Sequence, residues 1–145
     1  MAEHCFEFPS ELTAEIRLHR ELMRLLDQYD IDGDTVRILL LVMSEAFCNA
    51  VVHGNRLDPS LKVKVRVSIN DDSLIADIED QGFGASAVRG GRREAGLYDE
   101  GGRGIRLMEY FASSVDFDKT ESGGTIVRLR LDRSQHEADE IEFEK

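Results

Sequence analysis

The chain has 145 residues, of which 41% are hydrophobic and 32% are charged. This length and composition suit one globular domain and exclude an intrinsically disordered protein. The 18 Lys and Arg residues against 29 Asp and Glu give a net charge of −11, which disfavours binding to nucleic-acid phosphates or to an anionic membrane surface.

The N-terminal third predicts a short strand followed by two helices. Residues 4–8 are expected to form an edge strand, and Ser10 is suited to cap the helix that follows. Leucine and isoleucine recur every three or four residues over 11–28, which predicts an amphipathic surface helix. Residues 30–34 supply capping carboxylates for a second helix over 35–53, which is apolar on nearly every side and is expected to be buried.

The rest of the chain predicts strands around a glycine-rich loop. Residues 61–69 alternate apolar and polar side chains, and an antiparallel hairpin with 74–78 is expected. Residues 82–104 hold 8 of the 12 glycines and are predicted to be a long loop. The remaining predicted elements are a helix over 105–111 and strands over 114–118 and 125–131.

Location and organisation also follow from the sequence. No run approaches the roughly 20 apolar residues of a membrane span, and residues 1–30 lack a signal-peptide core, so we expect a cytoplasmic protein with no membrane partner. Cys5 and Cys48 lack metal-site spacing; both are expected to be reduced, with Cys48 in the core. We expect one domain over 1–135 and a solvated acidic tail over 136–145.

Three polar side chains interrupt the apolar second helix. Glu45, Asn49 and His53 recur at intervals of four and are expected to line one stripe. Such a stripe needs partners, either in a satisfied polar network or in a bound ligand. We favour a ligand, because a core network would have to satisfy three groups in one row.

A carboxylate and two glycines follow the predicted strand over 74–78. Glycine at 82 and 84 lets the backbone approach a flat or phosphorylated ligand, while Asp80 accepts a hydrogen bond from that ligand. Alone, this string is also typical of an ordinary turn.

A second glycine motif precedes the helix predicted over 105–111. Gly102, Arg103 and Gly104 stand where exposed N–H groups and the positive end of a helix dipole would bind phosphate. The Lys-Ser/Thr of a Walker A loop is missing, which argues against a P-loop nucleotidase. The glycine pattern of a dinucleotide fold is also missing from its expected place.

Taken in order, these motifs resemble the GHKL ATPase superfamily. The strings SEAFCNAVVHGN (44–55), IEDQGFG (78–84), GGRGIRLMEYF (101–111) and GGTIVRLRL (123–131) are most similar to anti-sigma-factor serine/threonine kinases of bacterial partner-switching systems. The resemblance runs from about Phe6 to Leu131. It implies the Bergerat ATP-binding fold, a two-layer α/β sandwich with helices on one face of a mixed, mostly antiparallel sheet.

The same resemblance implies the chemistry of the polar stripe. Asn49 matches the asparagine that coordinates the Mg²⁺ bridging the ATP phosphates. Glu45 matches the acidic residue that orients or deprotonates the attacking hydroxyl, and is the expected catalytic residue. His53 corresponds to a position near the triphosphate.

The glycine motifs acquire roles by resemblance as well. Asp80 matches the carboxylate that accepts a hydrogen bond from the adenine amino group, and Thr125 matches a threonine at the adenine end. Gly82 and Gly84 would leave space for the base, and residues 85–101 would be the ATP lid. The phosphates are expected against Gly102, Arg103 and Gly104.

The resemblance further implies partners. The chain is expected to phosphorylate a serine of a STAS-domain antagonist and to sequester a sigma factor or an analogous regulator, with Arg17 or Arg20 of the first helix at the contact. A homodimer is expected by analogy, through the N-terminal strand. Three alternatives stay open: an ATP-binding regulator-binding module without kinase activity, a detached histidine-kinase catalytic domain, and a scaffold without nucleotide.

Overall fold

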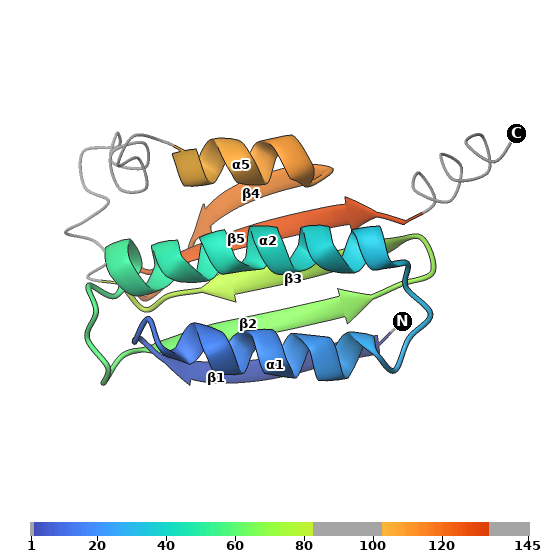
Figure 1. The fold of residues 1–145 in the computed structure, drawn as a ribbon. Coiled ribbons are helices and arrows are strands. Elements are labelled where there is room, and N and C mark those ends of the chain that lie inside the picture. Colours follow the sequence, from blue (N-terminus) through green and yellow to red (C-terminus); the bar gives the residue numbers. More distant parts are fainter. Residues whose placement is uncertain (1, 83–102, 134–145) are drawn as a thin grey trace, which may run out of the picture.

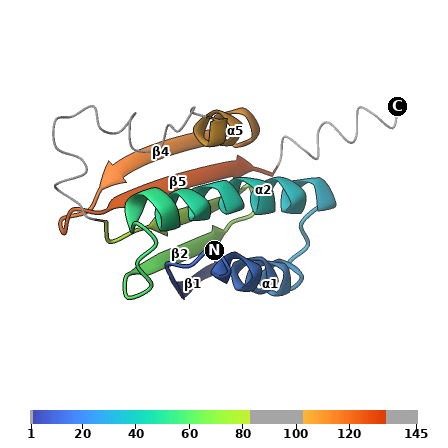
Figure 2. The ribbon, with the colours of Figure 1, turned by 60° about the vertical axis from the view of Figure 1, so that its left-hand side comes forward.

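Alternating apolar residues build one five-stranded sheet in the computed structural model, which describes residues 2–82 and 103–133. The strand order is β1-β2-β3-β5-β4, and every described pair is antiparallel. Three helices cover one face of this sheet (Figures 1 and 2). The predicted two-layer α/β sandwich is therefore confirmed, with an antiparallel sheet in the described part.

The observed elements follow the predicted order. The strands are β1 (Ala2–Pro9), β2 (Lys62–Ile69), β3 (Ser73–Glu79), β4 (Ser114–Lys119) and β5 (Thr125–Asp132). The helices are α1 (Ala14–Leu26), α2 (Gly33–Asn49), the π-helical turn η1 (Ala50–Gly54) and α5 (Arg103–Phe111). The expected lid (85–101), the acidic tail (136–145), Gly84 and Gly102 lie outside the described residues.

The register of the β2–β3 hairpin explains the alternation in the sequence. Val65 lies opposite Ile78, and Val67 lies opposite Ala76; all four face the helices and are buried. Charged partners such as Arg66 and Asp77 occupy the other face. The alternation of apolar and polar residues therefore places the apolar side chains on the face covered by helices. The charged side chains lie on the face without helices, as expected for a half-buried sheet.

The central helix, α2, is capped at its N-terminus and packs in the core. Asp32 caps α2 by accepting a hydrogen bond from the Thr35 N–H at 3.2 Å. Together α2 and η1 span 22 residues, and an 18-residue window within them has a mean hydropathy of 1.7. This is long and apolar enough to cross a membrane, contrary to the expectation that no segment approaches this. One such helix is weak evidence for a membrane span, and this one contacts α1, α5 and the sheet as a core helix does.

Two details of the sequence predictions were wrong. Ser10 does not cap α1, since Thr13 precedes that helix and the Ser10 hydroxyl instead donates to the Leu61 carbonyl at 2.7 Å. Cys48 is exposed instead of being a core residue, because it lies on the solvent-facing side of α2. The apolar run over 35–53 thus overstated how much of the helix surface is covered.

The antiparallel topology brings distant segments to one end of the sandwich. In Figure 1 this is the left-hand end, where α2 and β3 finish and where α5 and β5 begin. Each of the three predicted motifs lies at one of these termini. The fold therefore brings the three motifs to one end of the molecule, although they are far apart in the sequence.

Candidate functional site

Glu45 and Asn49 face the first turn of α5. A Cβ atom placed on Gly104 would lie 2.8 Å from Glu45 Oε1 and 3.7 Å from Asn49 Nδ2, so only glycine lets the two helices approach this closely. Asn49 Nδ2 is buried and has no hydrogen-bond partner among the described residues. A buried amide without a partner is costly, which points to a ligand that completes its hydrogen bonds.

The helix changes its geometry directly after Asn49. In η1 the Asn55 N–H donates to the Ala50 carbonyl at 2.8 Å, five residues back, as in a π-helix. The interval of four therefore places Glu45 and Asn49 on one stripe, whereas half-buried His53 lies in the wider π turn. Single π turns inside helices occur frequently at functional sites.

Asp80 is buried where β3 meets β5. Its side chain is held by the Thr125 N–H, which donates to Asp80 Oδ1 at 3.1 Å, while the Asp80 N–H donates to the Thr125 carbonyl at 2.9 Å. Asp80 is 2% exposed and Thr125 8% exposed. The structure thus brings these two predicted site residues together in one paired unit.

Two glycines that the sequence reading did not single out press against Asp80. A Cβ on Gly54 would lie 2.2 Å from Asp80 Oδ2, and one on Gly124 would lie 2.0 Å from the Asp80 carbonyl oxygen. No side chain fits at either position without moving Asp80. Both glycines stand inside the strings that carried the resemblance, but a single sequence does not show which backbones approach each other.

The turn after Asp80 is fixed by a buried asparagine that sequence reasoning also missed. Asn55 Oδ1 accepts hydrogen bonds from the Gln81 and Gly82 N–H groups at 2.9 and 2.7 Å. Gly82 has a φ of 63°, which favours glycine and agrees with its predicted place in a tight turn.

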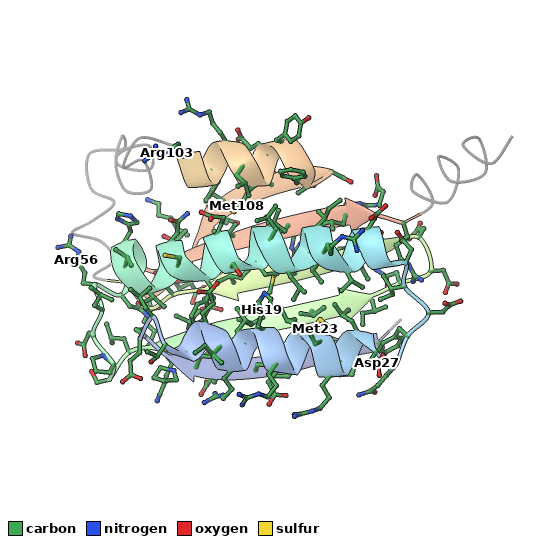
Figure 3. The ribbon with its side chains drawn as sticks, viewed as in Figure 1. His19, Met23, Asp27, Arg56, Arg103 and Met108 are labelled. Carbon is green, nitrogen blue, oxygen red and sulfur yellow. The ribbon has the colours of Figure 1, made fainter. Side chains whose placement is uncertain are left out.

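Basic residues lie at the same end of the molecule. Arg103 is exposed at the start of α5, and Arg56 follows η1 (Figure 3). Arg56 and Leu57 both have positive φ, at 55° and 61°, so the chain reverses sharply as it leaves the helix. Two positive side chains therefore border an end of the fold that also carries the carboxylates of Glu45 and Asp80.

The pKa of the Cys48 thiol depends on the negative charge of Glu45. Although Cys48 is exposed as a residue, partial burial of its thiol raises the pKa of that group, and the negative charges of Glu45 and Glu15 raise it further. The thiol is therefore held in its protonated form, which is a poor nucleophile.

The two arginines expected at a partner contact differ in their surroundings. Arg17 is tied to β1: its guanidinium lies 4.6 Å from the centre of the Phe8 ring and donates to the Glu7 carbonyl at 2.8 Å. Arg20 is exposed one turn along α1, between the exposed side chains of Ile16 and Met23. Both arginines are exposed, but the Arg17 guanidinium is engaged by β1.

The described residues fit a Mg²⁺ ion that is bound partly by the protein and partly by the phosphates of a nucleotide. No cluster of three or more His, Cys, Asp and Glu side chains able to cage a metal occurs within 2–82 and 103–133. Mg²⁺ typically binds one or two protein oxygens and completes its shell with substrate phosphates and water. Asn49 supplies an amide oxygen of this kind, while its buried Nδ2, which has no hydrogen-bond partner among the described residues, is a donor suited to a phosphate oxygen.

Comparison with known proteins agrees with this geometry. Residues 8–131 match the family described as the histidine kinase-like ATPase domain. The anti-sigma F factor of Bacillus subtilis (strain 168) is 29% identical over 115 residues, which cover 77% of this chain and 79% of that protein. The anti-sigma F factor of Geobacillus sp. (strain WCH70) is 30% identical over 107 residues, covering 71% and 73%.

A solved structure shares the fold. The crystal structure of the RsbU and RsbW domains of Rv1364c from Mycobacterium tuberculosis aligns with a TM-score of 0.66 at 17% sequence identity. The alignment covers 90% of this chain but 32% of that longer one. The likeness therefore concerns the fold of one part of that protein.

Proposed function

The chain belongs to the histidine kinase-like ATPase domain family, and from this we propose that it is an ATP-dependent serine/threonine protein kinase that also sequesters a sigma factor or an analogous regulator. The close relation to anti-sigma F factors supports the regulatory half of the proposal. The observation that carries the catalytic half is the meeting of Glu45, Asn49 and Gly104, where the buried Asn49 Nδ2 has no hydrogen-bond partner among the described residues.

Asn49 and Glu45 take the two roles that phosphoryl transfer needs. Asn49 would hold Mg²⁺ through its amide oxygen, and the ion would neutralise charge on the phosphates when bound. Glu45, one turn away, would orient the attacking serine hydroxyl and accept its proton as the γ-phosphoryl group moves to that oxygen and ADP leaves. Positioning and charge neutralisation then supply most of the rate.

The other site residues would hold the nucleotide. Asp80, fixed by Thr125, would accept a hydrogen bond from the adenine amino group, and the turn at Gly82 would leave room for the base. Gly104 and Arg103 stand at the N-terminus of α5, whose free N–H groups and positive dipole end suit phosphate. The phosphate side would be completed by His53 together with Gly84 and Gly102, which lie outside the described residues.

Partner recognition is assigned to the exposed side of α1. Ile16 and Met23 are 64% and 49% exposed and flank Arg20, a pattern suited to a mixed apolar and charged contact. Substituting Arg20→Ala is expected to weaken capture of the STAS-domain antagonist or of the regulator without changing ATP affinity. Arg17→Ala is the matched control, because Arg17 is held against β1; a loss confined to Arg17→Ala would contradict the assignment.

The proposal also includes the oligomeric state and the location of the protein. β1 has β2 as its one described neighbour, so its other edge is available to a second copy, and a cytoplasmic homodimer through this edge is proposed. Sedimentation equilibrium tests this directly: a monomer at micromolar concentration would contradict it.

Phosphate transfer from labelled ATP to the STAS-domain proteins of the same cell tests the kinase. The wild type is expected to label one of them on serine, and Glu45→Ala is expected to abolish transfer while ATP binding is retained. Glu109→Ala is the control, since Glu109 is an exposed acid on α5. ATP binding without transfer by the wild type would favour the second candidate, an ATP-binding regulator-binding module without kinase activity.

A further inference from the structure

We propose that Asn55 is a positioning residue of the nucleotide pocket, one that fixes the turn at Gln81 and Gly82 and thereby the orientation of Asp80. The inference rests on the proposed ATP site and names a residue that does not itself touch the nucleotide. Asn55 is completely buried, although it lies just beyond the end of a helix, where polar side chains are usually exposed.

The acceptor side of the amide closes the turn. Both the Gln81 and the Gly82 N–H groups donate to Asn55 Oδ1, so the two acceptor positions of that oxygen are filled. Successive N–H groups that point at one atom have little freedom to rotate. The turn is therefore held in one conformation.

The donor side anchors the same amide to the sheet. Asn55 Nδ2 donates to Ser10 Oγ at 2.8 Å and to the Lys62 carbonyl at 3.1 Å, at the end of β1 and the start of β2. The Lys62 N–H in turn donates to the Gln81 side-chain oxygen. All four hydrogen-bonding positions of the Asn55 amide are used, and they link three segments far apart in the sequence.

The position of Asn55 in the chain couples this link to Asp80. Gly54, the preceding residue, lies against the Asp80 carboxylate, and Gln81 is the residue after Asp80. The dipeptide Gly54-Asn55 therefore acts on Asp80 twice. Gly54 packs against its carboxylate, and Asn55 holds the backbone that follows it. Without the Asn55 oxygen, the Gln81 and Gly82 N–H groups lose their acceptor, and the Asp80 carboxylate keeps the Thr125 N–H but loses the fixed backbone that follows it.

Titration of ATP and of GTP, each with Mg²⁺, into three variants separates positioning from general stability. Asn55→Ala is expected to raise the Kd for ATP at least about tenfold and to reduce the preference for ATP over GTP, because unpaired N–H groups free the turn. Ser10→Ala removes one partner of Asn55 Nδ2, leaves both hydrogen bonds to Asn55 Oδ1, and is expected to stay within about threefold of the wild type. Thr35→Ala is the control: Thr35 is equally buried and bonded to Asp32, at the opposite end of α2.

Hydrogen exchange of the free protein gives a second readout. The Gln81 and Gly82 amides are expected to be protected in the wild type and to exchange rapidly in Asn55→Ala, while β5 amides stay protected. Wild-type ATP affinity and selectivity in Asn55→Ala would overturn the inference, as would a Ser10→Ala variant that binds ATP as weakly as Asn55→Ala. If Asn55→Ala does not fold, rapid exchange of both amides in the wild type would overturn it. Failure of the wild type to bind ATP would instead overturn the proposed function.

Discussion

At the scale of single residues, three glycines mark where the site permits no side chain. Gly54 and Gly124 enclose Asp80, and Gly104 lies against Glu45. The contact at Gly124 is the most restrictive, because the neighbouring atom is the Asp80 backbone carbonyl oxygen and cannot rotate away. Any added atom there must separate β3 from β5.

Gly124→Ala is accordingly expected to destabilise the fold by about 1–3 kcal/mol, since overpacking shifts the backbone, and to weaken ATP binding. Gly33→Ala is the matched control, because its Cβ would lie an ordinary 3.6 Å from Arg37 Nη1. Urea unfolding measures both changes. Equal stability of the two variants would show that the β3–β5 contact yields easily.

Cys48 offers a probe of the charge on Glu45. Its pKa is raised by burial and by the Glu45 and Glu15 carboxylates, and alkylation requires the thiolate. In a Cys5→Ser background, iodoacetamide is therefore expected to react slowly below the raised pKa. Glu45→Gln removes one negative charge, lowers that pKa and should speed the reaction, whereas an unchanged rate profile against pH would place Glu45 too far away to matter.

At the scale of elements, an ion pair joins strands on the face without helices. Arg128 of β5 donates from Nε and Nη2 to the two oxygens of Asp77 on β3, at 2.7 and 2.8 Å, and Arg66 of β2 lies 3.5 Å away. The Asp77 side chain is 9% exposed, so this paired geometry is better shielded than a surface pair.

Asp77→Ala is expected to lower the free energy of unfolding by about 1–3 kcal/mol, as for a hydrogen-bonded charged group. Asp132→Ala should cost no more than about 0.5 kcal/mol, because Asp132 pairs with Arg130 on the same strand and their side chains are 36% and 46% exposed. Urea unfolding of both variants, followed by circular dichroism, checks the difference. Similar losses would show that the Asp77 pair does not hold the strands together.

Elements with a clear period were the most predictable from sequence. The alternation over 61–69 predicted β2 to within one residue. The carboxylates over 30–34 include the observed N-cap, Asp32, but α2 begins at Gly33, two residues before the predicted start at 35. The π turn was not predictable, because nothing in the apolar run at 50–54 distinguishes it from an α-helix. The hydrogen bonds of the Asn55 side chain were not predictable either, because their four partners lie at the end of β1, at the start of β2 and in the turn after β3.

At the scale of the whole molecule, one core joins both layers. Phe8 of β1 meets Phe47 of α2 edge to face at 5.6 Å, and the buried residues of α1, α2 and the sheet form a single cluster. A continuous core predicts cooperative unfolding of all described elements together.

Phe47→Ala tests that continuity. The fully buried ring should cost about 3–5 kcal/mol when removed. The unfolding curves from circular dichroism and from tyrosine fluorescence are expected to shift together. Separate midpoints for the two signals would mean that α1 and β1 unfold independently of the rest.

The central claim is a nucleotide site that depends on Mg²⁺ and Asn49, and calorimetry tests it most directly. ATP is titrated into the wild type and into Asn49→Ala, each with and without Mg²⁺. The structure predicts Mg²⁺-dependent binding that Asn49→Ala loses, because the Asn49 amide oxygen is the proposed link to the metal and Nδ2, which has no partner among the described residues, is a donor suited to a phosphate oxygen. Absence of binding by the wild type at millimolar ATP, or equal binding by the variant, would contradict it.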